Sequence, residues 1–131
     1  MRALDTNIII RFLVKDDEAQ ARRVRSLLER AEATGDRFLI TTPVVLETIW
    51  VLSAVYDFSR GETLDALDLI AQMPIFEFEN YEITRELIHL GRATKLDLSD
   101  LLIGLAGQAS GAKTTITFEK GLPSTGLFER L

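Results

Sequence analysis

The chain has 131 residues, a length typical of one domain, and we expect a single domain over residues 1–131. Its content of 47% hydrophobic and 27% charged residues is that of a globular protein rather than a disordered one. The absence of cysteine excludes disulfides, zinc–thiolate sites and thiol catalysis, and the single histidine, His89, argues against a histidine-rich metal site.

Hydrophobic periodicity predicts strands that alternate with helices along the whole chain. The expected strands are residues 2–5, 37–41, 74–78, 113–118 and, at an edge, 126–131. The expected helices are residues 7–13, 15–35, 43–58, 61–72, 80–94 and 98–110. Gly35 suits the end of the second helix and Pro43 the first turn of the third. This alternation predicts the α/β class, with a mostly parallel sheet and helices on both of its faces.

Net charge and hydropathy indicate whether we should expect the chain to bind phosphate groups or a membrane. The net charge of −5 argues against a general phosphate-binding surface, although carboxylates that hold divalent cations can present positive charge to a phosphate. Asp5 interrupts the first apolar run too early for a signal peptide, and no stretch of ~18 uncharged apolar residues predicts a membrane span. We therefore expect a cytoplasmic protein that makes no use of a membrane.

Acids at the ends of the expected strands are the first candidates for function. In an open parallel α/β sheet, ligands bind outside the carboxyl ends of the strands. Asp5 ends the first expected strand, and Glu119 directly follows the strand that ends at Phe118. Each acid also has a local explanation, because Asp5 with Thr6 and Asn7 suits a turn or a helix cap, and Glu119 suits a turn. We expect Asp5 to be the acid at the end of the strand, and Thr6 and Asn7 to cap the helix that follows.

Glu47 is a candidate for a different reason. It lies in the segment VVLETIWVLSAVY, where Thr48 and Ser53 are the only other polar residues before Tyr56. A helix that is apolar on nearly all sides is expected to be buried, and a buried unpaired carboxylate costs several kcal/mol. We therefore expect an ion pair, a shifted pKa or a bound cation to compensate Glu47, and the alternative is that Glu47 lies at a partly exposed start of the helix.

Asp100 opens the helix of residues 98–110, where an acid in the first turn is common and where Asp97 or Ser99 suits the N-cap. What joins these four acids is chemistry rather than a local motif. Mg²⁺ and Mn²⁺ take oxygen ligands, and two to four carboxylates at one edge of a parallel sheet would hold such an ion. Without a cation, four clustered carboxylates would repel one another.

Four segments together resemble a known family. In chain order they are ALDTNIIIRFL, VVLETIWVL, LDLSDLLIGLAGQASGA and TITFEKGL. They resemble the PIN-domain ribonucleases, and in particular the VapC-type toxins of prokaryotic toxin–antitoxin pairs, from Met1 to about Leu122. The resemblance implies a three-layer α/β/α fold and hydrolysis of RNA phosphodiester bonds that depends on Mg²⁺ or Mn²⁺.

The resemblance also implies roles for single residues. Asp5, Glu47 and Asp100 match the core acids of the family, and Glu119 falls where the family usually has aspartate. Asp5 and Asp100 would hold the main metal ion, Glu47 would position the attacking water or act as its general base, and Glu119 would support a second ion. The supporting residues that match the family pattern are Thr6, Asn7, Asp97 and Thr117.

The partners that the resemblance implies are an RNA substrate, a cognate antitoxin protein and a second copy of the chain in a homodimer. Basic residues must attract the RNA, since the net charge will not. The candidates near the expected site are Arg11, Lys15, Arg92, Lys95, Lys113 and Lys120. An arginine or lysine of the antitoxin that entered the acidic pocket would inhibit by displacing the metal.

Three alternatives remain open from the sequence. A PIN scaffold that has lost catalysis would serve as an RNA-binding or interaction module, and the replacement of aspartate by Glu119 is the only sign of it. A haloacid-dehalogenase-type phosphatase also begins with an acid after its first strand, but it needs a second aspartate where this chain has Asn7. A receiver-like phosphoacceptor domain would need adjacent acids after the first strand, and Asp16 and Asp17 are wrongly placed for that.

Overall fold

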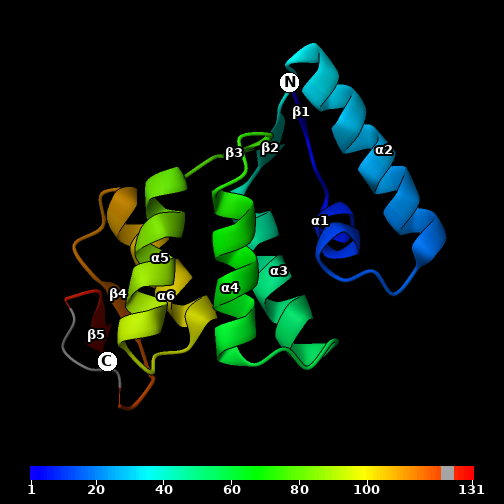
Figure 1. The fold of residues 1–131 in the computed structure, drawn as a ribbon. Helices are drawn as coiled ribbons and strands as arrows, with labels where there is room; N and C mark the ends of the chain where they lie inside the picture. Colours follow the sequence, from blue (N-terminus) through cyan, green and yellow to red (C-terminus); the bar gives the residue numbers. More distant parts are fainter. Residues whose placement is uncertain (122–125) are drawn as a thin grey trace. The chain divides into compact units, whose positions relative to one another are not determined.

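The computed structural model describes residues 1–121 and 126–131, so Leu122, the last residue of the motif TITFEKGL, lies outside the described part. The chain forms two compact units, Met1–Tyr81 and Glu82–Leu131, and each is described by itself. The elements of both units are labelled in Figure 1. Within the described residues, no helix is long and apolar enough to cross a membrane.

The first unit contains three strands and four helices. In chain order they are β1 (Arg2–Ala3), α1 (Thr6–Leu13), α2 (Glu18–Thr34), β2 (Phe38–Ile40), α3 (Thr42–Ala54), α4 (Arg60–Ala71) and β3 (Phe76–Phe78). The strands form one parallel sheet in the order β1-β2-β3, with Ala3 opposite Leu39 and Leu39 opposite Glu77. Because the strands are parallel, the residues that follow each of them lie at the same edge of the sheet.

Three helices of the first unit, α1, α3 and α4, pack around a common apolar cluster. Ile10 of α1, Leu52 of α3 and Ala66 of α4 are buried together. α1 also packs against α2, and α3 runs beside α4 (Figure 1). Gly35 ends α2 with a φ of 72°, a left-handed conformation that glycine adopts without steric cost, as the sequence predicts. This packing fixes where α1 begins, directly after β1.

The second unit contains two helices and two short strands. They are α5 (Tyr81–Ala93, whose first residue closes the first unit), α6 (Leu98–Ala109), β4 (Thr115–Thr117) and β5 (Phe128–Arg130). β4 and β5 pair in parallel, with Ile116 opposite Glu129. A Cβ atom on Gly104 of α6 would lie 2.8 Å from Cζ of Phe128, so the close approach of α6 to β5 requires glycine there.

Each expected element forms, with boundaries that differ by a few residues. The α/β class and the parallel pairing of strands are therefore confirmed. The strands of the described residues fall into two parallel sheets, one of three strands in the first unit and one of two strands in the second. The division of the chain into one or two domains stays a prediction.

Candidate active site

Asp5 occupies the first turn after the sheet in the first unit. Its backbone is extended (φ −76°, ψ 158°), and it is the N-cap of α1. The backbone N–H of Thr6 donates to Asp5 Oδ1 at 2.8 Å. The other carboxylate oxygen, Oδ2, has no hydrogen-bond partner among the described residues, and the side chain is exposed. Asp5 therefore caps a helix and still presents one free oxygen at the edge of the sheet.

The neighbours of Asp5 act differently from our expectation. We expected Thr6 and Asn7 to cap α1, and this is wrong, because Asp5 itself is the N-cap and the N–H of Ile8 already donates to the Asp5 carbonyl at 3.1 Å. Thr6 is buried below the turn, whereas Asn7 is exposed. Thr6 thus helps to anchor the start of the helix, and Asn7 faces solvent beside the acid.

Glu47 lies on α3, and the expectation that it is buried is wrong. The side chain is exposed and makes no hydrogen bond or ion pair with any described residue. α3 turns Val45, Ile49 and Leu52 inward, whereas Trp50 is 61% exposed. An apolar composition therefore buries only one side of this helix. Glu47 needs no compensating partner, and it is a free carboxylate on a helix that packs against α1.

Asp100 is the half-buried acid of the second unit. Asp97 is the N-cap of α6, and its side chain accepts the backbone N–H of Asp100 at 3.0 Å. The carboxylate of Asp100 makes no hydrogen bond among the described residues, and of the two N-caps that the sequence suggests, Asp97 rather than Ser99 has that role. Burial first, and then the negative charges of Asp97 and Glu119, raise the pKa of Asp100 above its ordinary value.

Glu119 follows β4 in an exposed turn. Its backbone N–H donates to Oγ1 of Thr117 at 3.0 Å, so the hydroxyl group orders the turn that carries the acid. The effect of Glu119 on the pKa of Asp100 shows that the two acids share an electrostatic environment. In the second unit, Asp100 thus lies within the electrostatic influence of two further acids, Asp97 and Glu119.

The predicted acids are divided between the two units. Asp5 and Glu47 belong to the first unit, and Asp100 and Glu119 belong to the second. Considering only residues 1–121 and 126–131, neither unit by itself brings three histidine, aspartate or glutamate side chains close enough to hold a metal ion. The grouping of all four acids stays a prediction from the sequence.

A further acid at the sheet edge was not among the expected candidates. Glu79 directly follows β3, and its Oε1 accepts the backbone N–H of Thr42 at 2.8 Å. This bond satisfies an N–H group at the start of α3, whose N-cap Thr41 makes no such bond with its own side chain. It also lowers the pKa of Glu79. The rule that selected Asp5 and Glu119, an acid directly after a strand, would have found Glu79 as well.

Comparison with known proteins identifies the family. The VapC ribonuclease of Aquifex aeolicus (strain VF5) is 21% identical over 126 residues, which cover 96% of this chain and 93% of that protein. The family model described as PIN domain matches residues 2–126, which include all four predicted acids. This match confirms the resemblance that the four motifs predict. The chain belongs to the PIN domain family.

Proposed function

We propose that the protein is a metal-dependent endoribonuclease that hydrolyses phosphodiester bonds of RNA. Its similarity to a VapC ribonuclease over nearly the whole chain supports the reaction. The observation that carries the proposal is the half-buried carboxylate of Asp100, which makes no hydrogen bond among the described residues and whose pKa is raised first by burial and then by the charges of Asp97 and Glu119. A carboxylate whose pKa is raised by burial and by neighbouring acids is typical of a functional site, and a bound cation would favour its charged form.

The donor atoms suit Mg²⁺ or Mn²⁺. Both ions prefer oxygen ligands, and the candidates Asp5, Glu47, Asp100 and Glu119 offer only carboxylates. Asp5 retains a free oxygen, and neither Glu47 nor the carboxylate of Asp100 makes a hydrogen bond among the described residues. An ion bound there would offset negative charge on the phosphate and on the leaving oxygen. Glu119 has a longer side chain than aspartate, so we assign it to the weaker, second ion position.

The protein's own side chains supply the proton transfer. Glu47 is exposed and unpaired, and it accepts a proton from the water that attacks phosphorus. The oxygen of that water bonds to phosphorus, the bond to the 3′ oxygen breaks, and the leaving 3′ oxygen takes up a proton from a solvent water. The products are a 5′-phosphate and a 3′-hydroxyl. Mapping of the product ends tests this step, and a 2′,3′-cyclic phosphate would contradict it.

We further propose that the protein is the toxin of a type II toxin–antitoxin pair in the cytoplasm and forms a homodimer. The similarity to a VapC ribonuclease supports the first part. Exposed apolar side chains on two neighbouring helices support a surface that a protein partner covers, namely Trp50 on α3, Val55 at its C-cap and Leu69 on α4. Size-exclusion chromatography with light scattering tests the dimer, and a monomer at micromolar concentration would contradict it.

Thermal unfolding with and without Mn²⁺ tests the metal site, using the wild type and Asp100→Asn. An ion that binds only the folded protein stabilises it by about 2.7 kcal/mol at 100 times its Kd. We expect Mn²⁺ to stabilise the wild type and not the variant, and we expect the variant to be more stable than the metal-free wild type. If Mn²⁺ has no effect and the variant is destabilised, the inactive-scaffold alternative replaces the proposal.

A further inference from the structure

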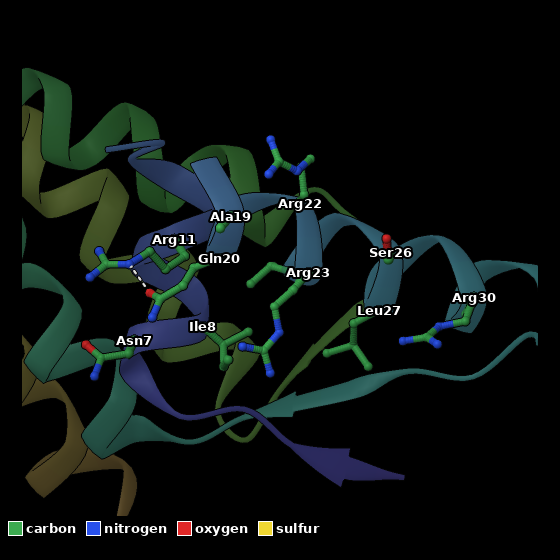
Figure 2. A pocket seen from close by; sticks show the side chains of 11 residues that line it. Asn7, Ile8, Arg11, Ala19, Gln20, Arg22, Arg23, Ser26, Leu27 and Arg30 are labelled. Carbon is green, nitrogen blue, oxygen red and sulfur yellow. Dashed lines mark hydrogen bonds between the residues drawn. The ribbon is translucent and has the colours of Figure 1, made fainter. Parts of the chain in front are cut away.

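A basic groove lies between α1 and α2 in the first unit (Figure 2). It has a volume of about 960 Å³ and is lined by 11 residues. Four of these residues are arginines and none is acidic, although the chain as a whole has a net charge of −5. The arginines are Arg11, Arg22, Arg23 and Arg30. Such a local reversal of charge selects an anionic occupant.

Most of these arginines are not used to stabilise the fold. Arg11 is engaged, because its Nε donates to Gln20 at 2.6 Å and one of its terminal nitrogens donates to Tyr56 at 2.9 Å. In contrast, the side chains of the other three make no hydrogen bond or ion pair with any described residue. Glu18 lies four positions before Arg22, a spacing that allows an ion pair, and none forms. Three guanidinium groups are therefore available to a ligand.

Most residues that line the groove are on α2, and one of the others, Asn7, is close in the chain to the candidate catalytic acid Asp5. Asn7, which lines one end, is two residues from Asp5 on the same unit. Figure 2 shows Arg23 reaching toward Ile8 of α1 and Arg30 lying further along α2, beyond Leu27. Seven positions of helix separate the two arginines, a rise of about 10 Å. The positive charge thus extends away from the acid along one direction.

We propose that this groove binds the backbone of single-stranded RNA and leads it to Asp5. The inference rests on the proposed ribonuclease function and names the surface that holds the substrate. A polyanion is repelled by an acidic active site, so binding requires cations nearby. The planar guanidinium of arginine matches phosphate with two parallel hydrogen bonds, and Arg23 and Arg30 supply it. Between them, the aliphatic side chain of Leu27 offers a contact for ribose or base.

An acidic peptide also suits a basic groove, but the position of the groove favours RNA. A substrate of the proposed reaction must reach Asp5, and the groove is lined by Asn7, two residues from Asp5 at the start of the same helix. The arginines of the groove differ in part from the basic residues that the sequence analysis expects to attract RNA. Arg11 lines it but is held by Asp16 and Tyr56, so the free cations are those of α2.

Binding of a labelled, mixed-sequence single-stranded RNA of about 12 nucleotides, measured in EDTA to prevent cleavage, tests the groove. We expect Arg23→Gln with Arg30→Gln to weaken binding about tenfold at low salt. The salt dependence of log K changes by roughly 0.7 per phosphate contact for single strands, so we expect the slope to fall by about 1.4. Lysine at both positions should restore most of the slope, because it keeps the charge.

Arg25→Gln is the matched control, because Arg25 is on the same helix and does not line the groove. We expect it to leave RNA binding unchanged. An equal loss in the control, or no loss in the double variant, would overturn the proposal. Thermal unfolding should show equal stability for all variants, since these side chains are exposed and unpaired.

Two further measurements separate the remaining explanations. A labelled amphipathic peptide of glutamate and leucine should bind the wild type and the double variant of Arg23 and Arg30 with the same affinity. If the double variant loses affinity for the peptide but not for the RNA, the groove binds peptides instead. Cleavage with Mn²⁺ tests the proposed function separately. If the wild type cleaves RNA and the double variant binds and cleaves it equally well, the RNA-binding role of the groove is contradicted and the ribonuclease function is not. A wild type that never cleaves contradicts the ribonuclease.

Discussion

The starts of α3 and α6 satisfy the same requirement with different carboxylates. A helix leaves its first N–H groups without partners inside the helix. At α3, the acid that accepts such a group is Glu79, which comes from the end of β3. At α6, the N-cap Asp97 does so itself, and the carboxylate of Asp100 in the same first turn is left unused.

The pKa values of the two acids shift in opposite directions as a result. The hydrogen bond from Thr42 stabilises the charged form of Glu79 and lowers its pKa. Burial and the neighbouring charges of Asp97 and Glu119 raise the pKa of Asp100. An acid at a helix start is thus a structural group where the backbone uses it, and a candidate for chemistry where the fold leaves it charged, crowded and unpaired.

Asp100→Asn should have the largest effect. The variant keeps the size of the side chain but removes the charge, so we expect RNA cleavage to fall by at least ~10²-fold. Folding stability should move the other way. The pKa of Asp100 is raised on folding, so the neutral form of Asp100 stabilises the folded protein at low pH. This contribution is lost as the pH rises through the pKa of the folded state. The metal-free variant should therefore unfold at a higher temperature than the wild type at pH 7, and a lower temperature would contradict the comparison.

Gly104→Ala tests whether α6 can be perturbed without changing its acids. The added Cβ would lie 2.8 Å from the ring of Phe128, so the ring or the helix must shift. We expect a loss of about 1–3 kcal/mol in the free energy of unfolding, measured by urea denaturation. Gly61→Ala is the control, since its nearest neighbour to a new Cβ is Oγ of Ser59 at 4.0 Å. Equal losses at both positions would show that packing against Phe128 is not the cause.

Asp97→Ala and Asp97→Asn separate the capping role from the charge of this residue. Alanine removes the bond to the N–H of Asp100 and should cost about 1 kcal/mol, whereas asparagine caps nearly as well as aspartate. Both substitutions remove a charge that raises the pKa of Asp100. Titration of Asp100 by NMR should therefore show a lower pKa in both variants. An unchanged pKa would mean that burial alone causes the shift.

The sequence predicts the order and type of the elements well, because hydrophobic periodicity and local signals such as Gly35 and Pro43 act over a few residues. It predicts burial less well. The apolar composition of α3 suggested that Glu47 is enclosed, but burial depends on which elements pack against a helix, and α3 leaves Trp50 exposed. Composition within one segment does not contain that information.

The candidate site shows the same limit. The four acids were found by their order along the chain and by family resemblance, which is independent of their local geometry. The choice between cap and free carboxylate at Asp97, Asp100 and Glu79 depends on single hydrogen bonds, and the sequence does not reveal these. The groove was missed because Arg22, Arg23 and Arg30 fit the exposed face of an amphipathic helix, and only the position of α1 turns that face into a lined groove.

Glu79→Gln should have the smallest effect, and its pH dependence completes the comparison. A group whose pKa is lowered on folding adds stability above its unfolded pKa of about 4.3, and this contribution is lost as the pH falls through the folded pKa. The difference in unfolding midpoint between wild type and variant should thus be present at pH 7 and vanish in strong acid. The difference in unfolding midpoint between wild type and Asp100→Asn should also vanish in acid, because protonation removes the unfavourable charge of Asp100. At pH 7 this difference has the opposite sign, with the variant more stable than the wild type. If the differences in unfolding midpoint for the two variants had the same sign across pH, the distinction between a structural carboxylate and one left free for chemistry would fail.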